Sequence, residues 1–223
     1  ISTWLGSGNV KIFVEPDALP YERIASDVST ELERVNILST LADFPFEKPG
    51  VSPPLIVASV PALVGKTPPY SDFISTKHII TQGMDYEPFQ LLRRWEAMGY
   101  RMDSVVEVPG TISHRGGIVD IFPPTSGMPA RIEFFGNTVD SIRLYDAVTQ
   151  RSVETVTSLA VGPATEMLMP LLKDEAGLEK MLGKLDFSGC SGEVAQQFRR
   201  EISMLKDRQS PQNLPFYSPL FNT

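Results

Sequence analysis

The chain has 223 residues, a formal net charge of −7 and an isoelectric point of about 4.9, and 42% of its residues are hydrophobic. This acidic balance argues against a general nucleic-acid coat, because phosphate binding requires a basic face, although a local basic patch can exist on an acidic body. The single cysteine, Cys190, allows no internal disulfide and fits a reducing compartment, and the longest apolar run, residues 55–64, is too short to span a bilayer. Because the sequence begins without Met inside a strand-like pattern, we expect a piece of a longer protein.

The first 80 residues predict the start of an α/β body. Residues 10–14 (VKIFV) favour a short strand, and residues 28–41 carry apolar side chains at helical spacing, with Ser26 or Asp27 placed to cap the helix. The run PPLIVASV at 53–60 is continuously apolar, which is typical of a strand buried on both faces of a parallel sheet. The fold class we expect is therefore an α/β body with a parallel sheet and helices.

The character of the sequence changes near residue 80. A helix is predicted over 87–98, beginning at Pro88 and ended by Gly99. From 104 to 162 short strands, the first over 104–110, alternate with turns, with hairpin connections at 123–130 and around Gly136. This pattern predicts an antiparallel meander with one helix, which is a small α+β domain.

Helical patterning returns after the meander, in one stripe over 171–185 and a second from Val194 to Leu205. We therefore predict a body split by an inserted domain. The first part of the body is 1–80, truncated at its start; the insert is 81–167; and the second part of the body is 168–223.

The usual catalytic patterns are absent from the sequence. The GKT at 65–67 has Val60 where a phosphate loop needs Gly, and two prolines follow it, so a plain turn is favoured. His78, His114 and Cys190 do not form a metal-ligand pattern or a Cys/His dyad, and the serines lack a nucleophile setting. We expect no catalytic residue, no metal and no cofactor in this chain.

Acidic residues of the meander lie among basic ones. Asp140 and Asp146 are close in sequence to Arg143 and Arg151. Ordinary cross-strand ion pairing is the expected explanation for these four residues.

The segment RIEFF at 131–135 has a more informative pattern. In a strand alternate residues share a face, so Ile132 and Phe134 should point into the core while Arg131, Glu133 and Phe135 point outward, where Arg115 can join them. One interpretation is that Phe135 packs under the helix and both arginines are solvated. The other is a docking face, because Arg and aromatic residues dominate interface energies.

Residues 80–165 strongly resemble the interaction domain shared by UvrB and the bacterial transcription-repair coupling factors. The resemblance rests on RGGIVDIFP, RIEFFG, DSIR and TQRS, while LPYE, VASVPALVGKTPP and LPFYSPLF in the flanks are similar to the coupling factors. It implies a non-catalytic, UvrB-mimicking N-terminal region that recruits UvrA to RNA polymerase stalled at a DNA lesion. It also implies that the α/β body is P-loop-NTPase-like but degenerate. By motif position, the resemblance assigns Arg115, Arg131 and Phe135 to UvrA binding.

The resemblance also implies properties of the longer parent protein. There the motor would be an ATP-dependent DNA translocase, and RNA polymerase and double-stranded DNA would bind to other domains. We expect a monomeric chain in the bacterial cytoplasm, with no membrane contact. Two alternatives remain open, a fragment of UvrB itself and a domain that binds DNA directly.

Overall fold

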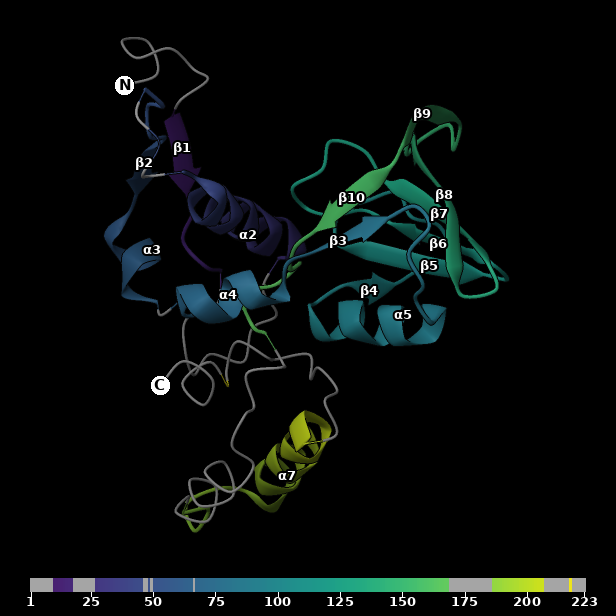
Figure 1. The fold of residues 1–223 in the computed structure, drawn as a ribbon. Coiled ribbons are helices and arrows are strands. Elements are labelled where there is room, and N and C mark those ends of the chain that lie inside the picture. The colour runs from purple at the N-terminus through teal and green to yellow at the C-terminus, as the bar shows by residue number, and fades with distance from the viewer. Residues whose placement is uncertain are drawn as a thin grey trace.

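The computed structural model describes residues 10–17, 27–45, 48, 50–65, 67–168, 186–206 and 217. Within these residues the strands form three sheets, of which two are pairs and one has six strands (Figure 1). The fold is thus a mixture of small sheets and few helices that includes a small α+β domain. None of the described helices is long and apolar enough to cross a membrane.

The predicted strand–helix–strand start is confirmed. Strand β1 (Val10–Phe13) pairs in parallel with β2 (Leu55–Ala58), and α2 (Val28–Asp43) lies between them in the chain. Asp27 caps α2 by accepting a hydrogen bond from the Ser29 amide. Phe13, Ile37 and Ala62 form the small core between this strand pair and α2. Among the described residues the parallel sheet has only these two strands, so a P-loop-type sheet is not confirmed.

Two short helices follow β2, and no apolar stripe in the sequence predicted them. Helix α3 (Val60–Val64) is capped by Ser59, and α4 (Tyr70–Thr76) begins directly after Pro69. The prolines therefore precede a helix, where their missing N–H costs nothing, instead of blocking one. Lys66 of the GKT segment lies outside the described residues.

The predicted antiparallel meander is confirmed in outline. Strand β3 (His78–Thr81) pairs antiparallel with β10 (Ser158–Val161), and between them lie α5 (Pro88–Ala97) and the six-stranded sheet. The strands of that sheet neighbour one another in chain order: β4 (Arg101–Met102), β5 (Thr111–Arg115), β6 (Ile118–Ile121), β7 (Ala130–Phe135), β8 (Thr138–Tyr145) and β9 (Ser152–Val156). All pairs are antiparallel except β4–β5.

The predicted strand over 104–110 is wrong. Strands β4 and β5 run parallel, so the chain must return between them, and residues 103–110 form that connection. The apolar side chain that looked like a strand residue, Val106, is buried in this loop. Its carbonyl accepts hydrogen bonds from Tyr145 and Gln150, which holds the loop against the sheet.

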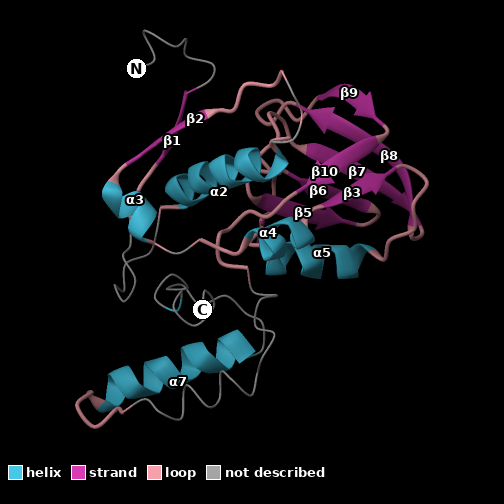
Figure 2. Cartoon of the chain, turned by 60° about the vertical axis from the view of Figure 1, so that its left-hand side comes forward, coloured by secondary structure: helices cyan, strands magenta, loops and turns pink. Residues whose placement is uncertain are grey.

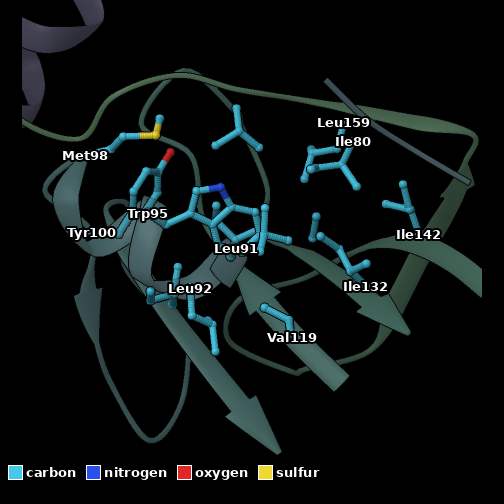
Figure 3. Close-up of a cluster of buried hydrophobic side chains, with 14 of the residues drawn as sticks. Ile80, Leu91, Leu92, Trp95, Met98, Tyr100, Val119, Ile132, Ile142 and Leu159 are labelled. Carbon is cyan, nitrogen blue, oxygen red and sulfur yellow. The ribbon is translucent and has the colours of Figure 1, made fainter. Parts of the chain in front are cut away.

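One face of the six-stranded sheet carries the main core (Figure 3). Trp95, which is fully buried, projects from α5 toward the sheet, together with Leu91 and Leu92. The strands contribute fully buried side chains at alternate positions, and β3 and β10 close the cluster with Ile80 and Leu159. The sheet members are Ile112, Val119, Ile121, Ala130, Ile132 and Ile142.

The segment after β10 is tied to α2 by a buried ion pair. Arg34 of α2 donates from Nε and Nη2 to the carboxylate of Glu166, 132 residues further on, just after β10. The same guanidinium donates to the Val14 carbonyl over 2.6 Å and lies 4.0 Å from the Phe13 ring centroid. Two segments far apart in the sequence are therefore held together at α2.

Helix α7 (Gly192–Lys206) confirms the second predicted apolar stripe. In both views α7 lies apart from the other described helices and strands (Figures 1 and 2). Its Phe198 packs between the rings of Phe187 and Tyr217, at centroid distances of 5.2 and 5.6 Å. The predicted stripe over 171–185 lies outside the described residues.

Candidate protein-docking face

The outer face of the six-stranded sheet is the face opposite α5. Ile132 on the inner side is fully buried and Phe134 packs against the core, while Phe135 on the outer side is 84% exposed. The alternation predicted for residues 131–135 is thus confirmed. The register continues the two faces across the sheet, because Arg115 lies opposite Ile118 and Ile118 opposite Glu133.

Phe135 ends β7, beside the two-residue turn of Gly136 and Asn137. Gly136 has φ of 64°, a conformation that this tight hairpin needs and that glycine adopts without strain. With 84% of its surface exposed, the Phe135 ring does not pack under the helix, so the first of the two interpretations is wrong for this residue. A large aromatic side chain held at a hairpin tip in water marks a candidate contact surface.

Arg131 is engaged within the sheet rather than free in solvent. Its Nε and Nη2 donate to the two carboxylate oxygens of Asp120 over 2.8 Å each, and its guanidinium carbon lies 4.8 Å from the Tyr145 ring centroid. These hydrogen bonds raise the pKa of Arg131 above its usual value. Asp120 therefore already accepts the hydrogen bonds of Nε and Nη2, and only the remaining edge of the Arg131 guanidinium can donate to a partner.

Arg115 lies at the exposed end of β5 and donates from Nη2 to the Ser104 carbonyl of the 103–110 loop. The turn that follows it brings β5 and β6 close to the end of β7. The Phe134 amide donates to the Gly117 carbonyl over 2.7 Å, and a Cβ on Gly117 would come within 2.9 Å of the Phe134 oxygen. Glycine at 117 is therefore required for the Arg115 turn to approach the strand that carries Phe135.

Carboxylates organise this face through pairings that the sequence pattern did not predict. Glu133 accepts from Ser141 over 2.9 Å and pairs with Arg143, and these two contacts lower its pKa. Arg143 is thus paired with Glu133, and the ion pairs expected for Asp140 and Asp146 are not found within the described part of the chain. The alternation pattern correctly placed Glu133 outward, but the opposition of Asp120 and Arg131 depends on a register that the sequence does not reveal.

The histidines have structural partners. The ring of His78 donates from Nδ1 to the Thr76 carbonyl and accepts at Nε2 from the Trp95 indole, over 3.0 Å each, and burial lowers its pKa. His114 meets the Phe89 ring edge-on at 4.9 Å. In the part of the chain that the structure describes, no three His, Cys, Asp or Glu side chains cluster as metal ligands.

Comparison with known proteins places this face within a recognised domain. Residues 79–167 match the model of a family described as the UvrB interaction domain. The chain is 37% identical over 175 residues to a transcription-repair-coupling factor of Bacillus subtilis, which is 75% of this chain and 15% of that protein. It is 35% identical over 153 residues to the protein of the same name from Myxococcus xanthus, 69% of this chain and 12% of that protein. A Staphylococcus aureus protein with that name is 43% identical over 98 residues, 42% of this chain and 8% of its own length.

Proposed function

The chain belongs, through residues 79–167, to the UvrB interaction domain family and is related to a segment of the transcription-repair coupling factors, and from this premise we propose that it is a non-catalytic docking region that recruits UvrA. The observation that carries the proposal is Phe135, an aromatic ring 84% exposed at a hairpin tip. Aromatic and Arg side chains contribute most of the binding energy at protein interfaces. Phe135 and Arg115 supply both kinds within one family-matched domain.

The three assigned residues have different roles in this proposal. Phe135 inserts into an apolar pocket of UvrA, and Arg115 meets a carboxylate at its rim through hydrogen bonds that Lys could not reproduce. Arg131, with its fork on Asp120, stiffens the face and offers its remaining edge. Arg143 compensates the negative charge of Glu133, which would otherwise repel an acidic partner surface.

Further proposals concern the longer protein, of which this chain spans about one sixth or less, judged by its relatives. In the bacterial cytoplasm the parent would couple RNA polymerase stalled at a lesion to nucleotide excision repair, using an ATP-driven DNA translocase elsewhere in the chain. The β1–α2–β2 unit would belong to a degenerate P-loop-like body. This chain itself would need no ATP or other cofactor and would be monomeric.

Two rivals make different predictions. A fragment of UvrB itself would be continuous with a working phosphate loop upstream, which sequencing of the parent gene decides. A domain that binds DNA directly would bind duplex DNA with a strong salt dependence, whereas the net charge of −7 leads us to expect weak binding.

The experiment is a titration of purified UvrA against the wild-type chain and single variants, each with a thermal melt. Phe135→Ala and Arg115→Ala should each weaken binding by about 2 kcal/mol, which is roughly 30-fold, and should change folding stability by only about ±0.5 kcal/mol. Val148→Ala is the matched control, because Val148 is 86% exposed in the β8–β9 connection. UvrA binding by Phe135→Ala within twofold of wild type would overturn the proposal.

Arg131→Ala is expected to behave differently from the other two variants. It removes the partner of Asp120, which is only 7% exposed, so it should lower folding stability by about 1–3 kcal/mol in addition to weakening UvrA binding. The paired variant Asp120→Asn keeps the shape of the contact but loses the charge. If Asp120→Asn binds UvrA normally, Arg131 contributes to UvrA binding through the outward edge of its own guanidinium. The orientation that the Asp120 carboxylate gives to Arg131 is then not needed for binding.

A further inference from the structure

The outer face of β5–β8 is almost entirely polar, with one aliphatic exception. By register, its members on β5 and β6 are Thr111, Ser113, Arg115, Ile118 and Asp120, and on β7 and β8 they are Arg131, Glu133, Phe135, Thr138, Ser141, Arg143 and Tyr145. Tyr145 is fully buried under Arg131 and the 103–110 loop. Ile118, 37% exposed, and Phe135 are therefore the two apolar side chains that this face presents to water.

The core does not account for Ile118. On the inner side of β6, Val119 and Ile121 are both fully buried. Ile118 has the opposite orientation, between charged and hydroxyl side chains, at a site where Thr or Arg would suit a solvated strand equally well. A single exposed aliphatic residue is ordinary on a protein surface. The position of Ile118 relative to Phe135, however, indicates a role for it.

Ile118 and Phe135 are diagonal neighbours on one face. Ile118 lies directly opposite Glu133, and Phe135 is the next residue of β7 on the same side. Residues in this relation lie about 7–8 Å apart across a sheet, close enough for large side chains to enter one slot of a partner. The bulge in this region falls between β7 and β8, so it leaves the β6–β7 register intact.

The charges around the pair are unequal. Glu133, which separates the two residues, is compensated by Arg143 and Ser141. Arg115, opposite Ile118, has no carboxylate within ion-pairing distance among the described residues. The pair is thus an apolar ridge with an uncompensated cation at the Ile118 end.

We propose that Ile118 is a second anchor beside Phe135, and that the UvrA site is an elongated apolar slot with a carboxylate at the end that receives Ile118 and Arg115. This proposal rests on the proposed function. Two anchors and one terminal charge fix the orientation of the docked domain, which a single inserted ring could not do. The Gly116–Gly117 turn serves this arrangement by letting the β5–β6 hairpin approach the end of β7.

The test is a titration of purified UvrA against the full chain carrying Ile118→Thr, which keeps the β-branched shape and removes the apolar end. We expect a roughly tenfold loss of affinity with a melting temperature close to wild type, while Val148→Thr, a similar aliphatic-to-Thr change at an exposed site in the β8–β9 connection, has no effect on either. Ile118→Val should bind nearly as wild type, and it replaces Ile118→Thr as a fold control if the latter melts early. The double variant with Phe135→Ala should lose less than the product of the two single effects, because both side chains occupy one slot.

The outcomes separate the two proposals. If Phe135→Ala weakens binding strongly while Ile118→Thr stays within twofold of wild type, Phe135 is a lone anchor and this inference is wrong, but the proposed function stands. Strictly multiplicative losses in the double variant would also overturn the single slot. If neither Phe135→Ala nor Ile118→Thr affects UvrA binding, the proposed function fails and the inference fails with it.

Discussion

The Arg34–Glu166 pair is expected to be the most sensitive point in the described fold. The side chains are only 4% and 11% exposed, and Arg34 also bonds the Val14 carbonyl and stacks on Phe13. Arg34→Met keeps much of the volume and removes the charge. Because it leaves Glu166 buried without a partner, we expect a loss of about 3–5 kcal/mol of folding stability.

For a chain of this length, each kcal/mol corresponds to about 2–4 °C, so the melting temperature should fall by about 6–20 °C. Urea unfolding at constant m-value gives the same quantity independently. The double variant Arg34→Met/Glu166→Leu removes both charges, and much of the lost stability should return, because the cost arises from the unpaired carboxylate. Arg93→Met is the control, since Arg93 is exposed on α5, and it should stay within about 0.5 kcal/mol of wild type. A single variant that loses less than about 1 kcal/mol, or a double variant no better than the single, would refute the reasoning.

Two further predictions concern the stability of the fold around His78 and Gly99. The lowered pKa of His78 means that the folded state favours the neutral ring, so the stability present above about pH 6.5 should be lost as the pH falls below that value. The physical reason is that protonation adds an N–H that would face the Trp95 indole donor. Thermal melts between about pH 7.5 and pH 5.5 should show this loss, and His78→Gln should make the melting temperature less dependent on pH. Gly99→Ala should cost about 2 kcal/mol or more in a thermal melt, because Gly99 has φ of 92° and a Cβ there would lie 2.4 Å from the Thr165 methyl group, whereas Gly127→Ala, which meets nothing within 4 Å, should be close to neutral. A pH-independent melt, or equal costs at the two glycines, would contradict these arguments.

Local patterns predicted the parts of the fold that local physics controls. The apolar spacing of α2, α5 and α7, the Asp27 cap and the outward position of Phe135 all follow from periodicities that the sequence displays directly. The apolar residues at 104–110 carried the same signal as a strand, but the parallel pairing of β4 with β5 made them a connection. Helices α3 and α4 have five and seven residues, too short for a repeating apolar stripe to reveal them.

The candidate site was predictable by residue type but not by partner. The alternation of strand residues placed Arg131 outward, yet its pairing with Asp120 depends on the register of β6 against β7, which is set across the long 122–129 connection. Arg34 and Glu166 are separated by 132 residues, and only the assembled fold brings them together. The sequence pattern therefore predicted an Arg131 side chain that is freer than the one in the structure. It did not predict the ion pair between Arg34 and Glu166.

The positions of these residues imply that folding and docking are separable. Arg34 and Glu166 lie in α2 and after β10, and neither belongs to the outer face that carries Ile118 and Phe135. Arg34→Met should therefore bind UvrA with wild-type affinity at temperatures well below its lowered melting point, whereas Phe135→Ala should melt normally and bind poorly. The measurement is one UvrA titration of both variants at a temperature where circular dichroism shows each fully folded. Weakened binding by folded Arg34→Met would mean that the Arg34–Glu166 pair helps to present the docking face, and folding and docking would not be separable.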